Sequence, residues 1–553
     1  IRYNQTMLWN IQNEFKDTDN LLDLLLENRG IISKKDVERF LTPPPIFELL
    51  KELPKEFKNS ASQARDFIQE AVDQKLPIIV HGDYDADGIC ATAILTSVLR
   101  EDFGHEKTYP FIPNRFDHGY GITPESIDAC IEKISGDIEG GLLITVDAGI
   151  TAVEAVAYAK EKGLKVIITD HHQKPKKLPK ADCIVWNDEF VGAGIAWVLG
   201  RIMATKNTQL LALAALATVT DLQPVTGYNR AIVKEGLMVL NTNPPIGLKI
   251  LHRIAGRAGK EITTYDLGWV FGPRINATGR IGDAQLALDL LLEKDEVLAS
   301  EYAQRLNSLN MDRQDKTMDM YNVVGELDKD NLPRVIVTSD QNYHEGIIGL
   351  VAAKLVQTYY RPAIVISLEG DLGKGSVRSV KGVNIIDFLR EFEDMFDSLG
   401  RHPMAAGFSI KANLIPELEK RINLLAEEQV LDEYLIPSLD VDVELPLDIV
   451  DIELLSEVEG LKPFGIGNKT PVFVSKEVTL TGFDIVGRDS KHLTLKLLFN
   501  GKNYRGIFFG KAYMARELTV GDLIDIAYTA EKNEYNGRTY VNIVIKDLIL
   551  SEK

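Results

Sequence analysis

Short apolar runs alternate with amphipathic helical stretches in the first part of the chain. The apolar runs are 76–80, 141–146 and 166–169, and the helical stretches around them are 61–74, 89–100 and 151–162. Apolar runs of this length, separated by helices, predict the parallel strands of a buried sheet. Because such sheets bind their ligands beyond the carboxyl ends of the strands, we expect the chemistry of the protein at those ends.

A different pattern begins after Asp221, where helical periodicity dominates. Residues 285–326 contain few helix breakers, which predicts one long helix or a helix pair between two domains. A second α/β unit follows, to about residue 420. Beyond Pro463, short strands alternate with Asn-Gly turns, which predicts a small all-β barrel.

The expected fold class is therefore α/β, with a parallel-sheet domain joined by a long helix to a second α/β domain and a C-terminal β-barrel. A chain of 553 residues accommodates several domains of ~100–200 residues each. The expected divisions are a helical segment at 1–60, the catalytic sheet domain at 61–225, a helical region and connecting helix at 226–330, the second α/β domain at 331–420, a linker at 421–462 and the barrel at 463–553.

Charge, hydropathy and cysteine usage narrow the class of protein. The net charge of −19 repels nucleic acid as a whole-molecule property, so a phosphate-binding surface has to be local. No window approaches the ~18 uninterrupted apolar residues of a membrane helix, and no secretory signal pattern is present. We expect a soluble, cytoplasmic protein without membrane association, although a start at Ile1 also suits a piece of a longer chain. The three cysteines are far apart and predict neither a disulfide framework nor a zinc site.

Acidic and imidazole side chains follow all three predicted strands. They are His81, Asp83, Asp85 and Asp87 after the first strand, Asp147 after the second, and Asp170, His171 and His172 after the third. Hard divalent cations such as Mg²⁺ or Mn²⁺ prefer carboxylate oxygen and imidazole nitrogen. Asp221 ends an apolar helix. The negative end of the helix dipole disfavours a carboxylate at this position unless a cation lies nearby. A single acid after a strand is more often a helix N-cap, and for Asp83 the two interpretations are equally good.

Three such clusters at neighbouring strand ends favour a two-metal centre over helix capping. A pair of cations could activate water and stabilise the leaving oxygen of an in-line attack on phosphorus. The sequence therefore predicts phosphoester hydrolysis.

Three further segments have the composition of phosphate-binding sites. Residues 272–280 combine glycines with Arg274, Asn276 and Arg280 in what we expect to be a loop, although pairing of an arginine with Asp283 explains the segment equally well. Residues 373–379 offer backbone amides, hydroxyls and two cations, and we expect a loop that forms an anion nest. Residues 402–407 place small residues around His402, which allows a ligand to approach the backbone closely, although a lone histidine more often has a structural role.

The joint pattern resembles the DHH phosphoesterase superfamily and, within it, the RecJ family of single-strand-specific 5′→3′ DNA exonucleases. The motifs that carry the resemblance are His81-Gly82-Asp83-Tyr84-Asp85-Ala86-Asp87-Gly88, Thr145-Val146-Asp147-Ala148-Gly149 and Asp170-His171-His172. Residues 376–379 and 402–408 resemble the companion DHHA1 domain, and the barrel resembles the OB-fold of the family. The resemblance covers about residues 61–553.

This resemblance implies a role for each motif residue. Two Mn²⁺ or Mg²⁺ ions would be held by His81, Asp85, Asp87, Asp147, His171 and Asp221. The implied catalytic residues are Asp83, His172, Asn276, Arg280 and His402. The implied contacts with the strand and its 5′-phosphate are Arg115, Tyr120, Arg280, Ser376 and Arg378. Candidate base-stacking aromatics of the barrel are Phe464, Tyr504, Phe508, Phe509, Tyr535 and Tyr540.

The family likeness also implies a biological setting and leaves two alternatives. Single-stranded DNA is the implied substrate, in DNA repair and recombination, with a single-strand-binding protein and a RecQ-type helicase as implied partners. One departure is Arg401, which stands where the family motif usually has a second glycine before His402; it would either add a contact or crowd the site. The alternatives are a DHH–DHHA1 phosphatase that acts on short nucleotides and a DHH-like scaffold that binds DNA without cutting it.

Overall fold

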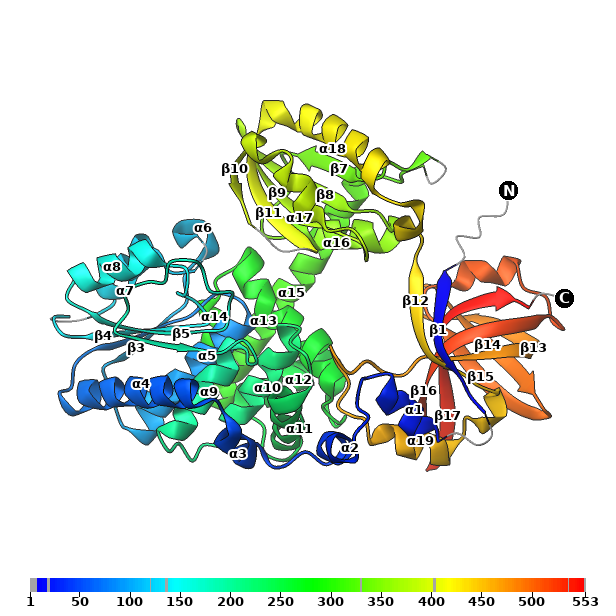
Figure 1. The fold of residues 1–553 in the computed structure, drawn as a ribbon, viewed down its shortest axis with the longest axis horizontal. Coiled ribbons are helices and arrows are strands. Elements are labelled where there is room, and N and C mark those ends of the chain that lie inside the picture. Colours follow the sequence, from blue (N-terminus) through cyan, green and yellow to red (C-terminus); the bar gives the residue numbers. More distant parts are fainter. Residues whose placement is uncertain are drawn as a thin grey trace.

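The structure is a computed structural model that describes residues 7–16, 20–119, 121–134, 138–328, 331–400, 404–535 and 537–551. Three lobes follow one another around a common centre (Figure 1). The first contains a five-stranded parallel sheet and a helical region, the second a mixed five-stranded sheet, and the third the β-barrel. Among the described residues, no helix is long and apolar enough to cross a membrane.

The first sheet has the parallel order β3-β2-β4-β5-β6. Its strands are β2 (Ile78–His81), β3 (Thr108–Phe111), β4 (Leu142–Val146), β5 (Lys165–Asp170) and β6 (Cys183–Trp186). Strands β2 and β4 are buried along their whole length, because helices cover both faces of the sheet. The helices of this layer are α4 (Lys55–Asp73), α5 (Ala86–Ser97), α6 (Arg115–His118), α7 (Pro124–Glu132), α8 (Val153–Glu161) and α9 (Gly192–Ile202). The predicted sheet is confirmed.

A helical region extends this core. Its helices are α10 (Leu210–Thr220), α11 (Gly227–Thr242), α12 (Ile246–His252), α13 (Gly272–Ile281), α14 (Gln285–Leu292) and α15 (Glu296–Val324). Helices α14 and α15 confirm the predicted helix pair, and α15 leads toward the second lobe (Figure 1). Residues 272–280 form most of helix α13, so our expectation of a loop was wrong. Gly272 and Gly279 are needed for close approach, since a Cβ there would lie 2.5 Å from Thr220 and 2.3 Å from the Tyr84 carbonyl oxygen.

The second lobe has the sheet order β10-β11-β9-β8-β7. Its strands are β7 (Ile336–Asp340), β8 (Ala363–Glu369), β9 (Leu372–Arg378), β10 (Phe396–Leu399) and β11 (Ala405–Lys411), and its helices are α16 (Ile348–Tyr359), α17 (Ile385–Arg390) and α18 (Ile415–Gln429). Residues 373–378 belong to strand β9, so the predicted anion-binding loop is a strand instead. Its alternating burial explains the pattern, because Gly373, Gly375 and Val377 are buried, whereas Lys374 is exposed and Ser376 and Arg378 are half-buried.

The third lobe is a closed five-stranded barrel, as predicted. It contains β13 (Phe473–Val486), β14 (His492–Phe499), β15 (Lys502–Phe508), β16 (Leu523–Tyr535) and β17 (Arg538–Leu550), and the β13–β16 pairing closes it. Strands β1 (Leu8–Glu14) and β12 (Ser438–Glu444) extend the sheet, and they pair in parallel. This topology is consistent with an OB-fold.

The first part of the N-terminal segment lies with the barrel, and its last part, from Ile46 on, packs in the core of the first lobe. Besides helices α1 (Leu21–Glu27), α2 (Lys34–Leu41) and α3 (Ile46–Leu49), it contains β1, so the expectation of a helical segment at 1–60 was incomplete. Side chains of α1 and α2 share the barrel's apolar core with those of α19 (Ile452–Glu459). Residues 421–462, expected as a linker, contain most of α18 together with β12 and α19. The alternation of buried and exposed side chains that is typical of a strand is weak in β1, because most of its side chains are exposed.

Candidate active site

Four side chains converge at the carboxyl end of the first sheet. Nε2 of His171 lies 3.0 Å from Oδ1 of Asp147, 3.6 Å from Oδ2 of Asp87 and 3.9 Å from Oδ2 of Asp221. Two overlapping groups have donor atoms within 4.8 Å of one another: Asp147, His171 and His172 form one, and Asp87, His171 and Asp221 the other. This arrangement of hard oxygen and imidazole donors fits Mn²⁺ or Mg²⁺.

Asp147 is positioned by an uncommon backbone conformation. It follows β4 directly and adopts a φ of 59°, in the left-handed region that few non-glycine residues enter. Gly192, the first residue of α9, packs against it, because a Cβ at Gly192 would lie only 2.4 Å from the Cβ of Asp147. The left-handed turn and the missing side chain together direct the carboxylate to His171. Such strain is often found at functional sites.

Asp85 and Asp87 also cap helices, so part of the alternative interpretation holds. Oδ1 of Asp85 accepts hydrogen bonds from the backbone N–H groups of Asp87 and Gly88 at the start of α5. The two oxygens of Asp87 accept from the N–H groups of Gly192 and Ala193, both at 2.7 Å, at the start of α9. The N-termini of two helices therefore stabilise negative charge beside the cluster.

The clustered carboxyl groups have raised pKa values. Burial, followed by repulsion from Asp87, raises the pKa of Asp147 well above its ordinary value. Burial also raises the pKa of Asp221 to about 8 and that of Asp83 to about 7, and neighbouring aspartates add to both. Within the described part of the chain, no Lys or Arg nitrogen lies within 4.0 Å of Asp87, Asp147 or Asp221. Uncompensated acids at this density are expected where a cation binds.

Two buried polar atoms support the fit to a cation. Oδ1 of Asp147 accepts no hydrogen bond from a described residue, although His171 lies near it, and Nδ1 of His81 has no described partner either. Nε2 of His81 lies 2.9 Å from the hydroxyl of Ser126, which also lies within hydrogen-bond distance of the carbonyl of Thr123; a proton on Nε2 satisfies this contact and leaves a lone pair on Nδ1. Burial lowers the pKa of His81 to about 4, which keeps the ring neutral. The free lone pair on Nδ1 is the form that binds a metal, although His81 belongs to neither of the two donor groups.

Asp170 supports the cluster without joining it, a role that our sequence reasoning did not assign. Its Oδ1 accepts from the backbone N–H groups of His171 and His172 and lies 2.8 Å from Nδ1 of His172, while Oδ2 accepts from the N–H of Ile150. The hydrogen bond that His172 donates to Asp170 raises the pKa of His172 to about 9. The Asp-His-His run was the available signal, because an acid two residues before a histidine can orient its ring.

Arginines gather beside this cluster and supply the local positive charge that the composition lacks. Burial lowers the pKa of Arg280 to about 10, and repulsion from Arg115, Arg313 and Arg378 adds to the effect. The Arg115 guanidinium lies 4.7 Å from the centre of the Tyr84 ring. Among the described residues, none of the four arginines lies within 4.0 Å of a carboxylate oxygen. Arg313, on α15, was not predicted, because nothing in the sequence places this helix next to α13.

Ser376 and Arg378 lie together under the N-terminus of α16. A guanidinium nitrogen of Arg378 lies 3.3 Å from the Ser376 hydroxyl, and both side chains would be 3.0 Å from a Cβ at Gly349. Asn276 has a structural contact, because its Oδ1 accepts from the N–H of Ala86 at 2.7 Å and so fixes the start of α5. Tyr120, Arg401 and His402 lie outside the described residues.

A groove of about 800 Å³ opens beside this cluster of acids and histidines. Its lining residues are Val219, Thr220, Leu222, Gln223, Val225, Thr264, Tyr265, Gly268, Trp269, Gly272, Pro273, Asn276, Arg280, Arg313, Gln314, Leu350, Phe464, Gly465, Ile466, Lys469 and Thr470. Nε2 of Gln223 lies 3.4 Å from Nδ1 of His171, which connects the groove to the cluster. Tyr265 and Trp269 are 58% and 72% exposed, and both were missed because isolated aromatics in a helical region give no sequence signal.

The barrel aromatics do not share one environment. Phe464 lines the groove, whereas Phe508 is buried in the barrel core. Phe509 and Tyr540 are exposed. The side chain of Tyr535 lies outside the described residues.

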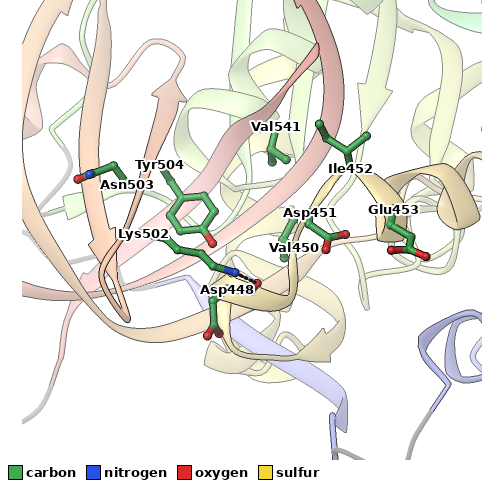
Figure 2. A pocket seen from close by; sticks show the side chains of 9 residues that line it. All are labelled: Asp448, Val450, Asp451, Ile452, Glu453, Lys502, Asn503, Tyr504 and Val541. Atoms are coloured by element: carbon green, nitrogen blue, oxygen red, sulfur yellow. Dashed lines mark hydrogen bonds between the residues drawn. The ribbon is translucent and has the colours of Figure 1, made fainter. Parts of the chain in front are cut away.

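Tyr504 points into a separate hollow of about 540 Å³ on the barrel (Figure 2). The acids Asp448, Asp451 and Glu453 line it, and Lys502 donates to the backbone carbonyl of Asp448. Burial and the two aspartates raise the pKa of the Tyr504 phenol. This acidic surface repels a phosphodiester backbone, so Tyr504 is poorly placed for base stacking.

Protein-family models match three parts of the chain. The DHH family, N-terminal domain, matches residues 77–219, the DHHA1 domain matches residues 332–428, and the RecJ OB domain matches residues 441–547. The three matches fall on the first sheet, the second α/β lobe and the barrel.

Curated relatives carry the description single-stranded-DNA-specific exonuclease RecJ. The relative from Thermus thermophilus is 30% identical, over 94% of this chain and 74% of its own length, and that from Escherichia coli is 27% identical, over 96% and 95%. The relative from Bacillus subtilis is 33% identical over 89% of this chain, and the chain spans 63% of its length, less than two thirds.

Solved structures show the same fold. A crystal structure of RecJ in complex with Mn²⁺ from Thermus thermophilus is similar with a TM-score of 0.82 and 27% identity, covering 100% of this chain and 80% of that one. A crystal structure of exonuclease RecJ bound to manganese has a TM-score of 0.57 and 34% identity, covering 68% of this chain and 95% of that one.

Proposed function

The chain belongs to the RecJ family, and from this premise we propose that it hydrolyses single-stranded DNA from the 5′ end to mononucleotides. The observation that carries the proposal is the convergence of Asp87, Asp147 and Asp221 on His171, within 3.0–3.9 Å of its Nε2. The fold alone would not be evidence for this reaction, because proteins that share a fold can have unrelated activities. Related RecJ structures were solved with Mn²⁺ and with Mg²⁺, which supports these two ions as cofactors.

We assign two divalent cations to this centre. Asp87, Asp147, His171 and Asp221 would form its inner ligands, with Asp85 and the free Nδ1 of His81 as additional donors. When bound, such a pair supplies activation of water and stabilisation of the leaving oxygen. Asp83 lies near these ligands but is not one of them in our proposal, since one of its oxygens accepts a hydrogen bond from the N–H of Tyr84.

The remaining side chains of the site would bind the phosphates of the strand. The hydrogen bond to Asp170 raises the pKa of His172 to about 9, so this ring can place a positive charge beside the cluster and contact the scissile phosphate. Arg280 and the nearby Arg115 would grip the backbone. Ser376 and Arg378, at the N-terminus of α16, would take the terminal 5′-phosphate, which gives the enzyme its polarity. His402 and Tyr120 are kept as proposed contacts from the family resemblance.

The groove explains a preference for single strands. A volume of about 800 Å³, bounded by three lobes, suits a flexible strand. Its exposed Tyr265 and Trp269 offer faces on which unpaired bases stack, whereas bases in a duplex are already stacked on one another. Arg313 and Lys469 supply positive charge along the same path.

The test is digestion of oligodeoxynucleotides that carry a 5′-phosphate, a 5′-hydroxyl or a blocked 3′ end, with Mn²⁺, with Mg²⁺ and with a chelator. We expect mononucleotides from single strands in the presence of metal, independent of the 3′ block and fastest with a 5′-phosphate. Asp147→Ala should nearly abolish turnover, and Asp128→Ala, which removes an acid bonded to Tyr158 on the outside of the same domain, should not.

Other outcomes would point to the alternatives. Hydrolysis of dinucleotides but not of long strands would indicate an oligonucleotide phosphatase. DNA binding without Mn²⁺ binding or cleavage would indicate a scaffold, and equal degradation of blunt duplex would refute the single-strand preference. We also propose a single-strand-binding protein and a RecQ-type helicase as partners and a cytoplasmic location, in DNA repair and recombination, on the family likeness; co-purification from cells tests the partners.

A further inference from the structure

Arg230, on helix α11, is a buried cation that makes its hydrogen bonds to backbone carbonyls. It is 1% exposed, and its guanidinium donates to the carbonyl oxygens of Phe40 at 2.8 Å, Leu461 at 3.0 Å, Pro463 at 3.3 Å, Gly460 at 3.4 Å and Lys462 at 2.8 Å. A guanidinium has five N–H donors, so these carbonyls use them all. Among the described residues, no carboxylate oxygen lies within 4.0 Å of it.

These carbonyls belong to a different lobe from the arginine. Helix α11 packs in the core of the first lobe, whereas Phe40 and the residues of α19 belong to the barrel core. Gly460 is the C-cap of α19, where unpaired carbonyls and the helix dipole favour a cation. The Arg230 guanidinium also lies 3.9 Å from the centre of the Phe40 ring. Arg230 therefore joins two hydrophobic cores through backbone atoms.

Apart from Phe40, the residues that carry these carbonyls belong to a turn that forms one wall of the groove. We call this turn, residues 460–470, the groove turn. Asn468 is fully buried and donates to the carbonyls of Leu461 and Pro463, so it holds the turn from the barrel side. The carbonyl of Ile466 accepts from the N–H of Val225 at 2.7 Å, and a Cβ at Gly465 would lie 2.6 Å from the Val225 side chain. Val225 is four residues beyond Asp221, so the turn rests on the segment that carries a metal ligand.

The outer side of the groove turn faces the proposed path of the strand. Phe464, Ile466 and Lys469 line the same groove as Tyr265 and Trp269. Ile466 is 45% exposed, although it lies in a turn that is otherwise fixed by hydrogen bonds. A rigid turn that exposes apolar side chains has the properties of a preformed stacking surface.

We propose that Arg230 is a positioning residue that fixes the groove turn against the catalytic lobe, so that Phe464 and Ile466 contact the bases that follow the scissile bond. This inference rests on the proposed exonuclease function. Arg230 touches neither metal ligand nor strand. Its effect is on the affinity for strands long enough to reach the groove turn, and a minimal substrate that occupies only the metal centre does not depend on it.

The test compares Arg230→Met with the wild-type protein on two substrates with 5′-phosphates, a dinucleotide and a strand of about 20 nucleotides. We expect Arg230→Met to raise the KM for the long strand about tenfold or more, with kcat and dinucleotide turnover changed less than about twofold. Arg230→Lys keeps three of the five donors and should restore part of the affinity. An equal loss on both substrates, or none on either, would overturn the proposal.

A matched control separates positioning from general destabilisation. Arg361 also donates to backbone carbonyls, those of Tyr360 and Leu435, but in the second lobe and away from the groove. Arg361→Met should lower thermal stability without changing the ratio of KM values for long and short substrates. A similar change of that ratio in both variants would assign the effect to stability and refute a specific role of Arg230.

A second variant and a binding assay keep the result independent of folding and of catalysis. Phe464→Ala leaves the five carbonyl contacts of Arg230 in place and should weaken binding of the long strand about fivefold or more. Fluorescence anisotropy of this strand in chelator measures binding without turnover. If the wild-type protein binds the strand but cuts nothing, the proposed function fails while the Arg230 effect can still be measured; if Arg230→Met binds like the wild type, the inference fails and the function does not.

Discussion

Replacement of Asp170 by Asn gives a sharp test of the electrostatics of the site. Asp170 is almost fully buried, and its Oδ1 has three neighbouring donors, the N–H of His171 at 2.7 Å, the N–H of His172 at 3.0 Å and Nδ1 of His172 at 2.8 Å. Among the residues that the structure describes, Oδ2 accepts only from the N–H of Ile150. An asparagine can keep its oxygen at the first position, but its NH₂ then faces the N–H of Ile150.

Two effects of different kind follow from this change. The unpaired N–H of Ile150 costs about 1–3 kcal/mol at every pH. Loss of the negative charge lowers the pKa of His172 from about 9 toward its ordinary value of 6.5, because Asp170 is the largest cause of the increase. The full difference corresponds to about 3.4 kcal/mol at 1.36 kcal/mol per pKa unit. Because 43% of the His172 side chain is exposed, solvent screening reduces this contribution to about 1–2 kcal/mol.

The sign of the pH dependence follows from linkage. A histidine whose pKa is raised in the folded protein contributes its full stability below pH 6.5 and loses it as the pH rises through about 9. The difference in unfolding free energy between wild type and Asp170→Asn should therefore shrink by about 1–2 kcal/mol between pH 6 and pH 10. Nearby acids such as Asp221 titrate in the same window in both proteins, so the comparison largely cancels their effect.

The assay is urea unfolding in chelator at several pH values, together with NMR titration of the His172 ring in the metal-free protein. Asp170→Asn should also lower kcat for single-stranded DNA, because its His172 would be less protonated and less well oriented at neutral pH. If the His172 ring titrates at the same pH in both proteins, Asp170 does not support its charge, and our account of the Asp-His-His run is refuted.

Three further predictions test the ligand cluster and the groove. Gly192→Ala should weaken Mn²⁺ binding about tenfold or more, measured by calorimetry, because its Cβ would lie 2.4 Å from that of Asp147. Gly194→Ala, whose Cβ would have its nearest contact at 3.2 Å, is the control on the same helix. Equal Mn²⁺ affinities of the two variants would contradict the geometry. Asp147→Asn should stabilise the metal-free protein at pH 8 in urea unfolding, because burial raises the pKa of this carboxyl group and its ionisation then costs stability as the pH rises; a less stable variant would contradict this. Trp269→Ala should weaken single-strand binding by about 5- to 150-fold, since a base stack contributes about 1–3 kcal/mol. Phe47→Ala, which removes an exposed aromatic of α3 outside the groove, should leave the affinity measured by anisotropy unchanged.

Strand ends were predictable because burial on both faces gives an unmistakable apolar run. The sequence alone therefore placed the acids that follow residues 76–80, 141–146 and 166–169 at one edge of a sheet. Helix α13 and strand β9 were misjudged for the opposite reason: their glycines serve close packing against Tyr84 and Phe408, and in a sequence such glycines look like loop residues. The strand β1 was missed because most of its side chains are exposed and show no alternation.

What the sequence determined by itself is the chemistry at the strand ends, because parallel strands must bring their carboxyl ends to one edge whatever the rest of the chain does. Tertiary structure alone decided which donor atoms meet: the left-handed turn at Asp147, the Asp170 contact that orients His172, and the convergence of Arg115, Arg280, Arg313 and Arg378 from separate elements. It also decided the groove, whose walls come from 219–225, 264–280, 313–314 and 464–470 together with Leu350. Contacts between segments so far apart depend on how whole lobes pack, and local hydrophobic periodicity carries no information about that packing.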